Sequence, residues 1–276
     1  MTKTRKFVNK FFMYLVLTLF CIILLFPIAN AVVSSFKTNA EINRVALFPS
    51  SFSFANYAKV VKTPIVWTGF LNSAIVVLST MALSVVLASF AGYGIARRTE
   101  KRFTAFYFLF LSAMMIPTAA NMSALYDLVR KLGLLDTRLG LILIYTAGAM
   151  PMGVMLYTGF LKSIPKELDE SATIDGCSYM QRFFVVILPL LKPIIVTQII
   201  TSCISVWNDF FTPLLLIRSA EKKTISVAIY AFSGENFSDW GAIFALLVLA
   251  MIPPVLLFIL CQKHFYQGIT TGAVKG

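Results

Sequence analysis

Residues 63–96, which read TPIVWTGFLNSAIVVLSTMALSVVLASFAGYGIA, decide the fold because they contain no charged side chain. A helix needs about 20 mostly apolar residues to cross the hydrocarbon core of a bilayer. Small residues recur near the end of this run, as in ASFAGYG at 88–94, and small residues let helix backbones approach closely. We therefore expect a transmembrane helix that packs tightly against other helices.

The composition of the whole chain supports a membrane protein. Hydrophobic residues make up 58% of the 276 residues, and charged residues only 13%. Soluble domains are about a quarter charged. The mean hydropathy is +0.82, and the charges cluster between long uncharged runs. This pattern indicates an integral membrane protein with all-α structure.

Four further uncharged runs have the length of a membrane span, at 11–36, 103–126, 139–161 and 240–262. A sixth candidate, 183–208, is interrupted by Lys192, whose long side chain can reach a membrane interface. The first run is too long for the apolar core of a signal peptide, so we expect it to be retained. We predict a polytopic bundle of six transmembrane helices with both termini on one side.

The distribution of basic residues predicts the orientation. With the N-terminus inside, segments 1–11, 96–102, 161–185 and 261–276 hold 13 Lys and Arg in 59 residues, against 10 in the 80 residues of the outer loops. Cytoplasmic loops carry an excess of Lys and Arg. We therefore expect a protein of the cell membrane (plasma or inner membrane) with both termini on the cytoplasmic side. The net charge is +12, but the basic residues flank the apolar runs and do not form one continuous stripe. Nucleic acid is therefore not an expected partner.

Several function classes are disfavoured by what the sequence lacks. Secondary carriers usually keep charged residues at mid-membrane, and only Lys192 and Asp209 come close. The single histidine, His264, leaves no Ser-His-Asp set for an intramembrane hydrolase, and no P-loop pattern is present. Neither a metal site nor a cofactor is expected from the cysteine spacing. A passive channel is the alternative that composition excludes least.

The longest predicted cytoplasmic loop, KSIPKELDESATIDGCSYMQR at 162–182, has room for structure of its own. Pro165 suits the first turn of a helix, and acidic residues near a helix start complement its dipole. Gly176 then favours a stop or a sharp bend. We expect a short helix, a glycine turn and a second amphipathic piece that enters the membrane at Pro189. On these grounds alone, a solvated connector is equally open.

This loop resembles the EAA loop of permease subunits in binding-protein-dependent ABC importers. That pattern is E-A-A, three residues, G, nine residues and I-x-L-P. The chain has ESA at 170–172, Gly176 and LP at 188–189, with Ser171 in place of Ala and Val186 in place of Ile. In the family, the loop is a coupling helix that docks on a cytoplasmic ATPase. The resemblance implies that role for Glu170, Ser171, Ala172, Asp175 and Gly176.

The C-terminal sequence QGITTGAVKG at 267–276 resembles that of the maltose-type second permease subunit, and the resemblance extends over nearly the whole chain. It implies a tail close to the ATPases and an outer loop whose tip contacts the binding protein. The implied tail residues are Gln267, Gly268, Thr270 and Gly272. The implied tip residues are Gly234, Glu235 and Asn236.

The resemblance thus implies a translocation subunit for a sugar or oligosaccharide. Its expected partners are a second, homologous permease, two ABC ATPase subunits, an extracellular solute-binding protein and membrane lipid. ATP hydrolysis would belong to the ATPases, so the chain itself is not expected to be an enzyme. A permease for another small polar solute, a stand-alone channel and a secondary carrier are the alternatives.

The expected organisation has three parts: residues 1–69 as one helix with an outer loop, 70–265 as the permease domain with the EAA loop at 161–189, and 266–276 as a cytoplasmic tail. Aromatic and amide side chains suit sugar faces and hydroxyls. For five candidates of this kind, packing between helices is the favoured interpretation: Asn72, Asn121, Tyr145, Trp207 and Asn208.

Overall fold

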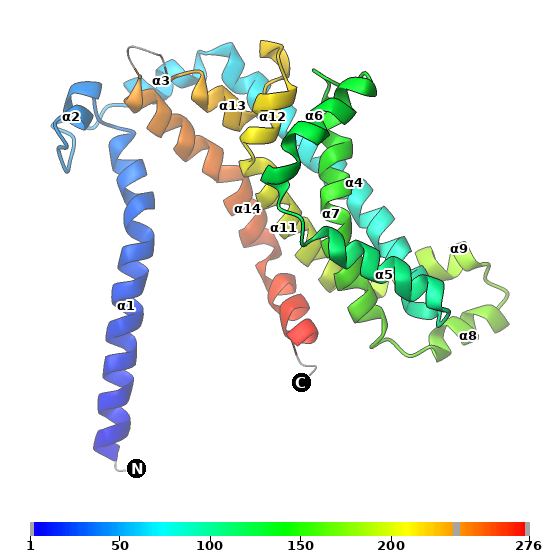
Figure 1. The fold of residues 1–276 in the computed structure, drawn as a ribbon. Coiled ribbons are helices and arrows are strands. Elements are labelled where there is room, and N and C mark those ends of the chain that lie inside the picture. Colours follow the sequence, from blue (N-terminus) through cyan, green and yellow to red (C-terminus); the bar gives the residue numbers. More distant parts are fainter. Residues whose placement is uncertain (1–2, 234–237, 274–276) are drawn as a thin grey trace. The chain divides into compact units, whose positions relative to one another are not determined.

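The computed structural model describes the backbone of residues 3–233 and 238–273, and the side chains of 9–117, 120–233 and 238–263 (Figure 1). Every regular element in these ranges is a helix, and one isolated bridge joins Ser233 and Ser238. The predicted all-α class is confirmed. The chain divides into two units, Met1–Val66 with Ile229–Met251, and Trp67–Ala228 with Ile252–Gly276.

Four described helices are long and apolar enough to cross a membrane: α1 (Lys3–Ser34), α4 (Pro64–Arg97), α7 (Arg138–Leu161) and α14 (Trp240–Ala273). A fifth span results if Tyr179–Leu190 and Lys192–Asn208, which meet at an angle of 76°, count as one. The described residues therefore do not give the predicted number of six. Lys192 lies at this bend and is exposed.

The predicted span at 103–126 accounts for the difference. It is divided into α5 (Lys101–Ala113), the 3-10 turn η1 (Thr118–Asn121) and α6 (Met122–Lys131). At 1.5 Å per residue, the 13 residues of α5 reach only about 20 Å, short of the roughly 30 Å hydrocarbon core. Pro117 lies in the break, and proline cannot supply the backbone N–H that would continue the helix.

The first unit contains α1, α2 (Asn39–Asn43), α3 (Ala55–Val61) and the beginning of α14. Side chains link its segments. Asn56 donates to the carbonyl oxygens of Ser35 and Lys37 at 2.8 and 2.9 Å. Lys59 forms an ion pair with Asp239 just before α14. No residue in the most apolar 18-residue stretch of α1 is buried, so this part of the helix presents an apolar surface.

The second unit holds α4 to α7 and the elements that follow. These are α8 (Glu167–Ile174), α9 (Tyr179–Gln181), the π-helical η2 (Arg182–Ile187), α10 (Leu188–Leu190), α11 (Lys192–Asn208), α12 (Phe211–Leu216), the 3-10 turn η3 (Ala220–Lys222) and α13 (Ile225–Tyr230), of which the last two residues belong to the first unit.

Small residues allow the long helices of the second unit to pack closely. A Cβ atom on Gly153 of α7 would lie 2.7 Å from Cβ of Ala88 in α4 and 2.6 Å from the Gln198 amide nitrogen in α11. A Cβ atom on Gly92 would lie 2.7 Å from Cβ of Tyr157. Real Cβ atoms do not approach so closely, so the packing of α7 against α4 and α11 requires glycine at positions 92 and 153. The expected tight packing is confirmed.

Candidate functional site

The loop after α7 begins with the short helix α8. Three of its first four residues are acidic, Glu167, Asp169 and Glu170, and their charge complements the positive end of the helix dipole. The helix ends at Ile174, and Gly176 follows the C-cap residue Asp175 with a φ of +79°. The N–H of Gly176 donates to Thr173 O at 3.0 Å, and that of Cys177 to Ala172 O at 2.9 Å. This is a Schellman motif, and it confirms the predicted glycine turn.

The chain then turns back into the second predicted piece. Ser178 and Gln181 form a capping box, with the Gln181 N–H donating to Ser178 Oγ at 3.3 Å and the Ser178 N–H to Gln181 Oε1 at 2.8 Å. The π-helical η2 follows and leads through Pro189 to α11. Figure 1 shows α8 and α9 beyond the ends of α4 and α7. We call residues 162–182 the coupling loop.

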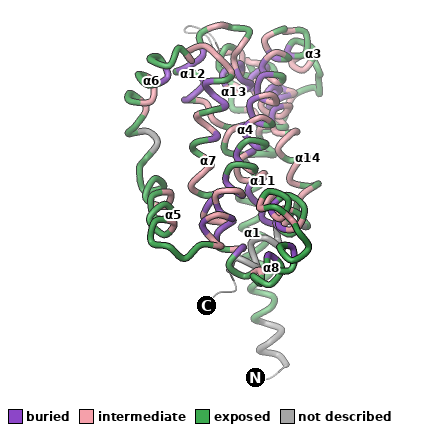
Figure 2. Tube along the Cα trace, turned by 90° about the vertical axis from the view of Figure 1, so that its right-hand side faces the viewer, coloured by how far each residue is buried: buried purple, intermediate pink, exposed green. Residues whose placement is uncertain are grey.

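The two faces of α8 differ sharply in exposure. Residues Glu167, Glu170, Ser171 and Ile174, spaced as i, i+3, i+4 and i+7, share one face and are all exposed. Ile174 is 86% exposed. Ala172 is buried and faces inward, whereas Asp175 and Gly176 are exposed. Figure 2 shows α8 as mostly exposed. An acidic outer face with one apolar side chain is thus available to a partner.

The inner face of α8 is held by Asp169. Its Oδ1 accepts a hydrogen bond from the Tyr93 hydroxyl, and its Oδ2 lies 2.9 Å from Arg97 Nε. Arg97 Nη1 also donates to the carbonyl oxygens of Leu161 and Ile164, both at 3.0 Å. The Arg97 and Asp169 side chains are only 11% and 12% exposed. We call Tyr93, Arg97 and Asp169 the Asp169 anchor.

Aromatic side chains extend this attachment to the returning part of the loop. The Tyr93 ring lies 5.2 Å from that of Tyr179 and 5.4 Å from that of Phe183, measured between centroids. Phe90, one turn earlier on α4, lies 5.1 Å from Phe183 in an edge-to-face arrangement. Such pairs stabilise beyond their buried area. One face of α4 therefore supports both halves of the coupling loop.

An open groove of about 570 Å³ lies beside the start of α8, and it is lined by Ala96, Arg97 and residues 162–167.

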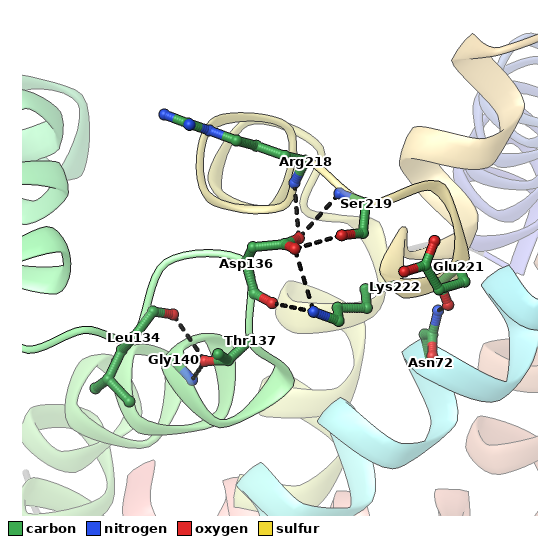
Figure 3. Close-up of polar contacts among 9 residues, drawn as sticks. All are labelled: Asn72, Leu134, Asp136, Thr137, Gly140, Arg218, Ser219, Glu221 and Lys222. Carbon is green, nitrogen blue, oxygen red and sulfur yellow. Dashed lines mark hydrogen bonds and ion pairs between the residues drawn. The ribbon is translucent and has the colours of Figure 1, made fainter.

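The opposite end of α7 carries a second polar cluster (Figure 3). Asp136, at φ +56°, accepts from the backbone N–H groups of Arg218 and Ser219 at 3.0 and 2.9 Å. It also accepts from the Ser219 hydroxyl and from Lys222 Nζ at 3.1 Å. The Ser219 hydroxyl and these other donors hold the pKa of Asp136 well below its ordinary range. We call Asp136, Arg218, Ser219 and Lys222 the Asp136 clasp.

The polar residues that suit a sugar are placed as follows. Asn72 is buried; its amide nitrogen donates to the Glu221 and Lys223 carbonyl oxygens, both at 2.8 Å, and its oxygen accepts from Arg138 Nε. Tyr145 donates to Asp209 at 2.9 Å at the end of α11. Trp207 is buried, and Asn121 and Asn208 are exposed. Asn72 thus has a packing role, as favoured from the sequence.

Sequence reasoning missed the Asp169 anchor. Tyr93 and Arg97 are four residues apart and so share a face of a helix, but nothing local connects them to Asp169, which lies 76 and 72 positions away. The implied tip residues Gly234, Glu235 and Asn236 lie outside the described residues. Gln267, Gly268, Thr270 and Gly272 fall within the last part of α14, and their side chains are not among those described. No metal-binding cluster occurs in the described part of the chain.

These features define a polytopic α-helical membrane protein with an exposed acidic helix between two apolar segments. Residues 84–271 match the family described as "Binding-protein-dependent transport system inner membrane component". The chain belongs to this family, which confirms the resemblance found in the coupling loop. It is therefore a membrane component of a transport system, and the family places it in an inner membrane.

Two relatives illustrate the similarity. The chain is 36% identical over 251 residues to the melibiose/raffinose/stachyose import permease protein MelC of Bacillus subtilis (strain 168), covering 91% of each. It is 32% identical over 275 residues to the maltodextrin transport system permease protein MdxG of the same organism, covering 99% of each.

A solved structure has the same fold. It is the crystal structure of a bacterial ABC transporter involved in the import of the acidic polysaccharide alginate, with a TM-score of 0.83 and 23% identity over 96% of this chain and 99% of that one.

Proposed function

We propose that this chain is the permease subunit of an ATP-driven importer and forms half of the translocation pathway for a sugar or oligosaccharide. The relatives named above are permeases for melibiose, raffinose, stachyose and maltodextrin. The observation that carries the proposal is the two-faced helix α8, with an acidic face exposed and an inner face fixed to the long helices. Such a helix suits docking on a partner and transmission of its movement.

The proposed partners are a second, homologous permease, two ABC ATPase subunits and an extracellular solute-binding protein, all within membrane lipid. Glu170, Ser171, Asp175 and Gly176 are exposed at α8 and are proposed to meet the ATPase. The buried Ala172 is proposed to set the close approach of α8 to its own chain. ATP hydrolysis is assigned to the partner, because the sequence has no P-loop pattern.

We place the coupling loop and both termini in the cytoplasm. The turn between α4 and α5 carries four basic residues in six, RRTEKR at 97–102, and such turns stay on the cytoplasmic side. In this orientation the tail residues Gln267, Gly268, Thr270 and Gly272 are proposed to approach the ATPases. The loop tip Gly234, Glu235 and Asn236 is proposed to contact the binding protein from outside.

The proposal is tested by purifying a tagged chain from its native membranes in mild detergent and identifying what accompanies it. We expect a second permease, an ATPase and a binding protein. The purified assembly, reconstituted in liposomes, should take up a sugar bound by that binding protein only when ATP is supplied. A chain that purifies alone and conducts the solute without ATP would establish a channel instead.

Substitution of Gly176 tests the coupling role of the loop. Gly176→Trp should leave membrane insertion intact and reduce ATP-driven uptake by about tenfold or more, because the side chain strains a positive φ and protrudes at the docking face. Gly133→Trp is the matched control, since Gly133 has φ +69°, is exposed and has open space around it, as Gly176 does. Normal uptake by a stable Gly176→Trp protein would contradict the role.

A further inference from the structure

The helix α8 has two separate attachments to its own chain. It packs against η2, which continues through α10 into α11. It is also joined by the Asp169 anchor to the end of α4 and, through Arg97, to the carbonyl groups at the end of α7. The groove lined by residues 162–167 lies beside its beginning. Any movement of α8 can therefore reach the long helices by two different routes.

The anchor has the properties of a rigid connection. Both charges are almost fully removed from water, at 11% and 12% side-chain exposure. Removing one partner of such a pair is strongly unfavourable, because the other charge is left buried and uncompensated. Arg97 is further fixed by two bonds to carbonyl oxygens. Asp169 therefore cannot separate from α4 without a large cost, whereas the neighbouring Glu167 and Glu170 are exposed.

We infer that Asp169 is a positioning residue that transmits the displacement of α8 to the ends of α4 and α7. This inference rests on the proposed function, since the displacement comes from the docked ATPase. The anchor makes α8, the end of α4 and the end of α7 move as one body. Without it, α8 stays connected mainly through η2 to α11, and only part of its movement reaches the pathway.

The test is Asp169→Asn in the complete importer reconstituted in liposomes. The carboxamide retains nearly the same shape but loses the charge that pairs with Arg97. We expect assembly and ATP hydrolysis to persist while uptake per ATP hydrolysed falls by about fivefold or more. A purely structural defect would lower uptake and hydrolysis together and leave their ratio unchanged. Asp127→Asn, the same substitution at an exposed aspartate on α6 outside the coupling loop, should keep the ratio of the unaltered importer.

Tyr93→Phe provides a milder variant in case Asp169→Asn fails to assemble. It removes one hydrogen bond to Asp169 and keeps the ion pair, so uptake per ATP should fall by about twofold. Hydrogen exchange of the α8 amides in the purified importer gives a readout independent of transport. Exchange should be faster in both anchor variants than in Asp127→Asn.

The outcomes separate the two ideas. An active importer in which the anchor variants keep the unaltered ratio of uptake to hydrolysis would overturn the role of Asp169 and leave the proposed function standing. An unaltered importer without ATP-dependent uptake would overturn the proposed function itself.

Discussion

An aspartate that joins distant segments lies near each end of α7, Asp136 just before it and Asp169 in α8 after it, and the two are held differently. Asp169 is 12% exposed and is held by the Tyr93 and Arg97 side chains of another helix. Asp136 is 26% exposed, and backbone N–H groups together with the Ser219 and Lys222 side chains hold it. One carboxylate depends on a buried countercharge, and the other on several donors at the surface.

This difference predicts how each end responds to damage. Removal of one partner of a buried ion pair costs several kcal/mol, whereas water screens and partly replaces contacts at a half-buried carboxylate such as Asp136. The Asp169 anchor should therefore fail abruptly, and the Asp136 clasp gradually. The end with the abrupt response is the end proposed to receive force from the ATPase, where a stiff connection is useful.

The largest expected effect is that of Arg97→Ala. It leaves Asp169 buried without its cation and removes two hydrogen bonds at the end of α7. The free energy of unfolding should fall by about 3–5 kcal/mol, measured by thermal unfolding of the purified protein in detergent.

Arg98→Ala is the matched control for this prediction. Arg98 lies beside Arg97, but its side chain is 50% exposed, and it lies 3.6 Å from Glu100. Loss of an exposed pair should cost less than about 1 kcal/mol. Equal losses for Arg97→Ala and Arg98→Ala would show that burial does not distinguish the Asp169 anchor.

An intermediate effect is expected for Asn72→Ala at the other end. The buried amide donates hydrogen bonds to two carbonyl oxygens in the loop after α12 and accepts one from the Arg138 guanidinium. Its loss should lower the free energy of unfolding by about 1–3 kcal/mol. The concentration of sugar at half-maximal uptake should not change, because the amide is fully occupied by the protein. Asn121→Ala, at an exposed position, should cost under about 0.5 kcal/mol. Weakened sugar affinity with unchanged stability would instead place Asn72 in the pathway.

Sequence reasoning succeeded where a property is local. Uncharged runs locate the long helices, and Gly176 with the acidic residues before it fixes the start and end of α8. The run at 103–126 misled because hydropathy is insensitive to Pro117, which lies in the break between α5 and η1. The motif also gave no direction for its residues. Helical geometry places Ala172 and Glu170 on different faces of α8. Which of the two faces is buried depends on the position of α4, and the motif does not contain that information.

The Asp169 anchor was beyond sequence reasoning for a related reason. In the sequence, Asp169 is one of three acidic residues in four, all equally suited to a helix start. Its distinct role depends on Arg97 and Tyr93 reaching it across 72 and 76 positions. Pairing over such distances follows from the packing of α4, α7 and η2, and no spacing rule predicts it.

The smallest effect, and the one that tests the exposed side of the comparison, is the pH dependence of the Asp136 clasp. The hydrogen bond from the Ser219 hydroxyl, followed by those from the backbone and Lys222, lowers the pKa of Asp136 in the folded chain. A lowered pKa means that the charged form stabilises the fold fully above the unfolded pKa of about 3.9. That contribution is lost as the pH falls through the folded pKa.

Asp136→Asn should therefore lower the midpoint of thermal unfolding at pH 7, by less than half the shift of Arg97→Ala. The gap between the unaltered protein and Asp136→Asn should stay constant from pH 7 to pH 5 and shrink only below about pH 4. Asp127→Asn, at an exposed position on α6, controls for the general loss of a carboxylate. A gap that closes already between pH 7 and pH 5 would mean that the clasp does not favour the charged form of Asp136, and the contrast between surface donors and a buried countercharge would then fail.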